Sequence, residues 1–220
     1  MVDLLVNYEL MVEMLGGNPE DRNIHESFVS SKAPTDAKRK LELDSLEHVE
    51  KSTSCVLFRM PDGTPAVSPH IFKGQIKAAC KAVRDFPDSA CKQLKNYVSR
   101  MNMHVHVYPV PNDGEELTKC ALVPLVVPEG GEIGHCVRPV PGNGPQGPRT
   151  AIKNSETVPA GTTFSVIIRV LMDSMVPAVK ETLRFGQYVG LGEWRASNIK
   201  GRFTHTIVSE TKRDFLGNLV

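Results

Sequence analysis

Residues 161–210, GTTFSVIIRVLMDSMVPAVKETLRFGQYVGLGEWRASNIKGRFTHTIVSE, contain the pattern that decides the fold. Residues 161–173 are rich in β-branched side chains and predict a strand. Residues 174–192 predict a helix with Ser174 as its N-cap, and residues 201–210 predict the last strand. The segment therefore predicts a strand-helix-strand unit.

An earlier part of the chain has the same order of elements. Residues 2–14 predict a strand and not an export signal, because they carry acidic residues, no basic start and no clear cleavage site. Residues 69–86 predict a helix, with Ser68 as cap and Pro69 at the first helical position. Residues 103–110 alternate with a period of two and predict the next strand.

The remaining segments predict additions to these two units. Residues 54–70 predict a β-hairpin, because two apolar runs flank the turn sequence of residues 61–63. Residues 121–127 and 133–140 predict further strands. Residues 32–52 are charged, contain few large apolar side chains and predict a surface insert.

Together these elements follow the β-α-β-β-α-β order of the ferredoxin-like fold. We expect an α+β protein in which the middle strands extend a mainly antiparallel sheet. A chain of 220 residues is long enough to bury a sizeable core as one elaborated domain, residues 1–220.

The composition excludes two classes of protein. With 26 Lys and Arg against 25 Asp and Glu, the chain lacks the overall positive charge of a nonspecific polyanion binder, so any nucleic acid must bind a local patch. The five cysteines are odd in number and form no CxxC pair, which argues against a disulfide framework or a structural zinc site. We expect free thiols and a cytoplasmic protein.

Residues 139–149, PVPGNGPQGPR, hold four prolines and three glycines and predict a long loop. Long loops inside a domain are usually functional or disordered. Arg138 and Arg149 could each bind a phosphate in bidentate fashion, and Gln146 could read a base edge. The alternative is a surface loop with incidental arginines.

Residues 190–201 predict a second functional loop, between the last helix and the last strand. Gly190, Gly192 and Gly201 could let backbone N–H groups approach phosphate, beside basic side chains. The alternative is that the first two glycines end the helix and the third starts the strand.

Basic side chains also recur along the helix predicted over residues 69–86, which is ordinarily a solvated face. Such a row would matter only if the fold placed it beside the two loops. The complete set of candidate ligand-binding residues is Lys73, Lys77, Arg138, Gln146, Arg149, Trp194, Arg195, Lys200 and Arg202, with the loop glycines Gly147, Gly190, Gly192 and Gly201.

Histidines are the only candidate catalytic groups. Alternation places His104, His106 and Tyr108 on one face of the predicted strand. A general base among His104, His106 and His25 is an open alternative. No carboxylate or cysteine is placed to complete a metal site with them, so we expect neither a metal nor a cofactor.

A strand, a helix, a glycine-rich connection and a last strand resemble the end of the RAMP superfamily of CRISPR-associated repeat-binding proteins. In that superfamily the C-terminal glycine-rich loop lies against RNA. The stretch GLGEWRASNIKGRF, residues 190–203, resembles that loop. The resemblance implies that Gly190, Gly192 and Gly201 have matching roles.

Nearly the whole chain also resembles a family of small proteins encoded in bacteriophages and prophages. The resemblance is carried by LGGNPED, SSKAP, FKGQIKAAC, RPVPGNGPQGPR, SETVPAGTTF and GQYVGLGEWRASNIKGRF. The sequence departs from typical members at Gln75, where they have an aromatic residue, and at residues 141–145, where they have fewer glycines and prolines. The resemblance supplies no chemistry.

The leading hypothesis is a non-enzymatic phage protein that binds RNA, single-stranded DNA or a nucleotide in a basic cleft. The two loops and the helix of residues 69–86 would form this cleft. The alternatives are a counter-defence protein that mimics or blocks a CRISPR RAMP subunit or sequesters a cyclic nucleotide, a metal-independent endoribonuclease, and a self-assembling structural protein. The partners would be nucleic acid or nucleotide, a host defence complex or further copies of the chain, in the cytoplasm of a bacterial host and without a membrane.

Overall fold

A computed structural model describes residues 1–19, 55–111, 117, 121–144, 147–193 and 199–214. Of residues 18–19, 139–144 and 147–152 only the backbone is described. The surface insert expected over residues 32–52 lies outside the described residues.

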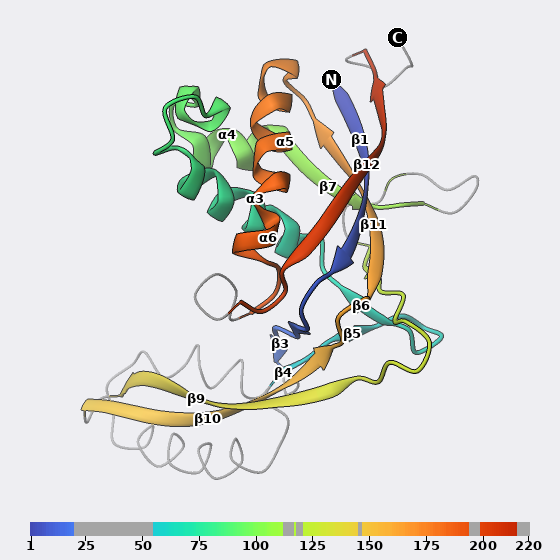
Figure 1. The fold of residues 1–220 in the computed structure, drawn as a ribbon, viewed down its shortest axis with the longest axis vertical. Helices are drawn as coiled ribbons and strands as arrows, with labels where there is room; N and C mark the ends of the chain where they lie inside the picture. Colours follow the sequence, from blue (N-terminus) through green and yellow to red (C-terminus); the bar gives the residue numbers. More distant parts are fainter. Residues whose placement is uncertain (20–54, 112–116, 118–120, 145–146, 194–198, 215–220) are drawn as a thin grey trace, which may run out of the picture.

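A four-stranded antiparallel sheet forms the centre of the molecule (Figure 1). Its strand order is β12-β1-β11-β7, and every neighbouring pair is antiparallel. Numbered along the chain, these are strands 4, 1, 3 and 2 of a β-α-β-β-α-β unit, which confirms the expected ferredoxin-like α+β fold. The strands are β1 (Val2–Leu10), β7 (Val105–Pro109), β11 (Thr163–Val170) and β12 (Phe203–Lys212).

Helices cover one face of this sheet (Figure 1). Alternate residues of β1 and β11 point toward them, which is why both strands alternate between buried and more exposed positions. Tyr8 stacks on Phe164 with ring centroids 5.1 Å apart, and it contacts Phe72 of the first helix at 5.4 Å. The helices are α3 (His70–Val83), α4 (Tyr97–His104), α5 (Val176–Arg184) and α6 (Gly186–Val189), with short 3-10 turns η1 (Ala90–Gln93) and η2 (Asp173–Met175).

Two of the sequence's predictions about helices need correction. Ser174 lies in η2 and is not the cap of α5, which begins at Val176. The strand expected over residues 103–110 begins only at Val105, because α4 continues through His104. An apolar-polar alternation of a few residues also fits the end of an amphipathic helix, so the pattern alone could not place this boundary.

The departure at Gln75 has a structural role. This side chain is buried on α3, and its Nε2 donates to the carbonyl oxygen of Thr182 on α5 at 3.1 Å. A polar side chain at this position therefore joins the two covering helices through a buried hydrogen bond.

The middle strands form two further sheets instead of extending the first. Five strands pair as β2-β10-β4-β3, with β9 paired to β10. Three short strands pair as β5-β6-β8, and β5 and β6 form the hairpin expected around residues 61–63. The strands are β2 (Met14–Leu15), β3 (Asn18–Pro19), β4 (Cys55–Val56), β5 (Phe58–Arg59), β6 (Pro65–Val67), β8 (Val123–Pro124), β9 (Gly134–Gly144) and β10 (Gly147–Val158).

The prediction that residues 139–149 form a loop is wrong. Strands β9 and β10 pair continuously from Gly134 with Thr157 to Gly144 with Gly147. Proline is tolerated because the outer edge of β9 carries no further described strand, so a missing N–H there breaks no ladder bond. We call this hairpin, residues 134–158, the arm, because it extends away from the helices and the central sheet (Figure 1).

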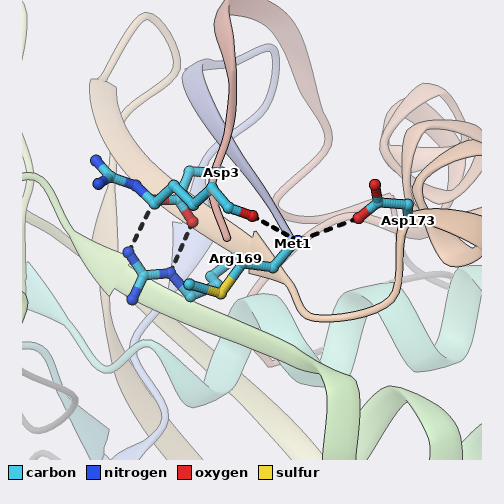
Figure 2. A network of polar contacts seen from close by, with 5 residues as sticks. Met1, Asp3, Arg169 and Asp173 are labelled. Atoms are coloured by element: carbon cyan, nitrogen blue, oxygen red, sulfur yellow. Dashed lines mark hydrogen bonds and ion pairs between the residues drawn. The ribbon is translucent and has the colours of Figure 1, made fainter. Parts of the chain in front are cut away.

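A network of ionic contacts joins the start of β1 to β11 and to the end of β12 (Figure 2). Asp3 accepts from Arg169 Nε at 2.7 Å and Nη2 at 2.8 Å, and from Arg213 Nε at 2.8 Å. The amino group of Met1 lies 3.3 Å from Asp173 Oδ1 and donates to the Arg213 carbonyl at 2.9 Å. These contacts stabilise the end of the sheet farthest from the arm.

Among the described residues, no helix is long and apolar enough to cross a membrane.

Candidate nucleic-acid interface

The glycines between α6 and β12 serve close backbone packing. Gly190, Gly192 and Gly201 have φ values of 70°, 75° and 66°, which residues with a Cβ rarely adopt. A Cβ on Gly201 would lie 2.0 Å from the Leu191 carbonyl oxygen, and one on Gly192 would lie 2.7 Å from that of Leu15. The segment around these glycines therefore packs against itself and against β2.

Three backbone donors of this segment are used inside the protein. The Gly190 N–H donates to Gly186 O at 2.9 Å, the Leu191 N–H to Gly201 O at 2.8 Å, and the Gly201 N–H to Glu13 O at 2.8 Å. The expectation that the glycines expose backbone N–H groups to phosphate therefore does not hold for these three donors. Gly190 also ends α6 as its C-cap, as the alternative interpretation predicted.

The arm meets the stretch of residues 190–202, here called the glycine-rich segment, at Glu193. Arg138 on β9 donates from Nη2 to Glu193 Oε2 at 2.7 Å. Lys153 on β10 donates from Nζ to Oε1 at 2.8 Å and to Oε2 at 2.6 Å. The two segments singled out in the sequence are thus neighbours, joined by an acidic residue that was not among the candidates.

The strand register explains why a carboxylate is needed at this point. Arg138 and Lys153 are direct partners across the β9–β10 ladder. Like charges directly opposite one another destabilise a sheet. Because the Arg138 side chain is only 8% exposed, water screens this repulsion poorly. Glu193 supplies the opposite charge to both cations.

Cys55 lies against the same cluster. Burial raises the pKa of Cys55 above its ordinary value, although the hydrogen bond and charge of Lys153 act in the opposite direction. A thiol with a raised pKa is a poor nucleophile. Four of the cysteines, Cys55, Cys80, Cys91 and Cys136, are free thiols, as expected, and Cys120 lies outside the described residues.

The basic row of α3 lies beside α4 and not beside the arm. Lys73 Nζ donates to the Asn102 carbonyl of α4 at 2.8 Å, and the Arg84 guanidinium lies 4.7 Å from the ring centroid of Tyr97. Lys77 is half-buried between them on the same helix. These contacts at both ends of α3 show that α4 runs alongside it. The structure therefore does not bring Lys73 and Lys77 into one cleft with the two other segments.

Two further candidates, Lys200 and Arg202, belong to the glycine-rich segment itself. Lys200 Nζ forms an ion pair with Glu13, the residue just before β2. Arg202 is half-buried, and its Nε has no hydrogen-bond partner among the described residues. Gly147 and Arg149 lie on β10, opposite Gly144 and Gly142. Gln146, Trp194 and Arg195 lie outside the described residues.

The histidines do not assemble into a site. His104 ends α4 while His106 lies on β7, where its Nε2 is 3.1 Å from the Met103 carbonyl oxygen. Burial lowers the pKa of His205, and the charge of Arg184 lowers it further. Within the described part of the chain, no three His, Cys, Asp or Glu side chains are grouped as metal ligands. His25 lies outside the described residues.

Sequence reasoning missed Glu193 and Lys153, which connect the two segments, and Glu13, which pairs with Lys200. Glu193 sits within the glycine-rich stretch among basic residues, and this lone opposite charge was the available signal. The pairing of Lys153 with Arg138 depends on the hairpin register, which could not be read from a stretch expected to be a loop.

No protein-family model matches the chain, and no curated protein matches it in sequence. Solved structures that resemble its backbone include the following three. "Cryo-EM structure of the Type III-B Cmr-beta bound to cognate target RNA" matches with 12% identity and a TM-score of 0.46, over 94% of this chain and 60% of that one. "Type IV-B CRISPR Complex" matches with 14% identity and a TM-score of 0.43, over 99% and 95%. "Crystal structure of Cmr6 from Pyrococcus furiosus" matches with 10% identity and a TM-score of 0.43, over 94% and 98%.

This chain therefore spans 60% of the length of the first of these structures. We assign the ferredoxin-like fold from the strand order of the central sheet and not from these similarities, because their TM-scores are below 0.5.

Proposed function

We propose that this protein binds single-stranded nucleic acid, preferably RNA, where the arm meets the glycine-rich segment. The observation that carries the proposal is the Arg138–Glu193–Lys153 cluster. It joins two segments that are both rich in basic residues and holds them in a fixed relation. Two cations and one carboxylate leave the cluster with a net charge of +1.

The charge along the arm supports the same interpretation. Residues 134–155 contain Arg138, Arg149 and Lys153 and no Asp or Glu. Positions 149 and 153 are an even number of residues apart on one strand, so they belong to the same phase of its alternation. An extended strand pair with basic residues on one phase can follow a phosphate backbone.

The glycine-rich segment adds a second basic stretch. Residues 194–202, WRASNIKGR, contain Arg195, Lys200 and Arg202, a tryptophan and no acidic residue. Basic side chains combined with an aromatic ring suit single strands, since every base has a face on which a ring can stack. In this proposal Arg149 and Arg195 contact phosphates and Trp194 stacks on a base.

Binding of labelled oligonucleotides tests the proposal. We expect fluorescence anisotropy with a 20-nucleotide single-stranded RNA to show an affinity that falls as salt is raised, by about 0.7 in logarithmic slope for each phosphate contact. Arg149→Ala and Arg195→Ala should each reduce the slope, whereas Lys95→Ala, an exposed residue just before α4, should not. Absence of binding at low salt, or binding that salt does not weaken, contradicts the proposal. Parallel titrations with DNA show which nucleic acid is preferred.

A counter-defence role is the second candidate. In this role the protein would compete with a CRISPR subunit for RNA. The resemblance to phage proteins and the RAMP-like order of elements support it. The test is competition: the purified protein should displace a RAMP subunit from labelled CRISPR RNA at concentrations near its own dissociation constant. Failure to displace it while RNA binding is retained removes this role alone.

A further inference from the structure

A cleft beside Glu193 lies between β2 and β4 of the five-stranded sheet, the β5–β6 hairpin and the start of α3. It has a volume of about 370 Å³, within the range of small-ligand pockets. Glu193 and Gly192 of the glycine-rich segment form part of its wall. The other walls come from β2, β4, β5, β6 and the first turn of α3.

The side chains of this cleft have the chemistry that an unpaired nucleobase requires. Leu15, Val67 and Ile71 supply apolar surface. Phe58 is half-buried and His70 is exposed, and both line the cleft, so two rings are available for stacking. Bases that leave a single strand are typically held by stacking on such rings.

Glu193 adds a hydrogen-bond acceptor of fixed orientation. Its side chain is 29% exposed, and Arg138 and Lys153 hold both carboxylate oxygens. Oε2 accepts two of these three hydrogen bonds and Oε1 accepts one, so Oε1 retains capacity for another donor. Gly17 leaves room beside this side chain, since a Cβ there would lie 3.1 Å from Glu193 Cγ.

We infer that this cleft takes one unpaired nucleobase with an exocyclic amino group, which stacks on Phe58 or His70 and donates to Glu193. The inference rests on the proposed function and adds base selectivity to it. A base that presents a carbonyl oxygen in place of the amino group would meet the carboxylate with another acceptor, leaving both groups without a partner. The site would therefore favour adenine, guanine or cytosine over uracil.

The test compares oligonucleotides that differ in one amino group, on the wild-type protein. Nine-nucleotide oligouridine strands carry adenosine, purine riboside or an abasic nucleotide at the centre, and their affinities are measured by anisotropy. We expect adenosine to bind about tenfold more tightly than purine riboside, which lacks only the amino group, and purine riboside to bind more tightly than the abasic strand.

Variants then assign the selectivity to the cleft. Phe58→Leu should reduce the advantage of purine riboside over the abasic strand. Glu193→Gln should bring the ratio of adenosine to purine riboside below about threefold, because an amide in this charged environment presents its oxygen to the two cations. Phe86→Ala is the control, since this aromatic residue is 56% exposed and follows the far end of α3.

The results separate this inference from the proposed function. If all three strands bind with the same affinity and the same salt dependence, the protein binds nucleic acid and the base site does not exist. If adenosine is preferred but Phe58→Leu and Glu193→Gln leave both ratios unchanged, the selectivity arises elsewhere and the inference is wrong. If no strand binds, both proposals fall.

Discussion

Arg138 and Lys153 lie directly opposite each other in the β9–β10 ladder, and both donate hydrogen bonds to Glu193. A two-stranded hairpin is marginally stable by itself in water. This cluster therefore does more than connect two segments, since it supplies ionic contacts at the point where the arm leaves the body of the protein.

Replacing the shared carboxylate should destabilise the fold. Glu193→Ala leaves a largely buried arginine opposite a lysine, and we expect a loss of about 2–3 kcal/mol in the free energy of unfolding, measured by urea titration. Glu132→Ala, at an exposed position just before the arm, is the matched control and should change little. Adding Lys153→Met to Glu193→Ala should recover part of the loss, and an equal or larger loss in the double variant would contradict this account.

The Asp3 network should make stability depend on acid pH. Burial by itself would raise the pKa of Asp3, but hydrogen bonds and charges from Arg169 and Arg213 together hold it below its ordinary value of 3.8. A group with a lowered folded-state pKa stabilises the fold above its unfolded-state pKa, and this stabilisation is lost as the pH falls below about 4.

Asp3→Asn should therefore be destabilising at pH 7 and less destabilising at pH 3, when compared with wild type at each pH. Urea titrations at the two pH values measure the difference. Asp85→Asn serves as a control for acid effects elsewhere, because Asp85 is exposed just after α3. An equal loss at both pH values would show that the charge of Asp3 is not what stabilises the network.

The two kinds of glycine in the chain should respond differently to alanine. Gly201 has φ +66° and no space for a Cβ, whereas Gly63 has φ +86° and no atom within 4 Å of the added Cβ. Gly63→Ala should cost about 1 kcal/mol from backbone strain alone. Gly201→Ala should cost at least about 3 kcal/mol, because the backbone of Leu191 must also move. Similar urea midpoints for the two variants would mean that the glycine-rich segment is loosely packed.

Shortening the arm should separate binding from stability. Strand β9 pairs only with β10 among the described strands, and the arm extends away from the helices and the central sheet (Figure 1). Replacing residues 140–151 by Asn-Gly should leave the melting temperature within about 3 °C and reduce RNA affinity at least about tenfold. Unchanged affinity would move the binding surface away from the arm.

The candidate site was predicted in part. The stretches around Arg138 and around the glycines were predicted to lie side by side, and they do. Both were selected because clustered glycine, proline and arginine mark unusual backbone in any fold. Assignment of the arm as a loop failed, since proline content lowers strand propensity but does not exclude an edge strand. Lys73 shows a different limit: periodicity places a residue on a face of its helix and says nothing about which element covers that face, which here is α4.

The amino-acid sequence by itself determined the order of strands and helices in the central unit, because the periods of apolar residues and the turn residues act over a few positions. It also determined that the chain has no large overall excess of positive charge, so basic side chains can act only in local stretches. Only the tertiary structure decided which of these segments meet. Residues 138, 153 and 193 come together through a strand register and a close backbone packing that depend on the burial of the whole core, and no local pattern encodes such contacts between distant positions.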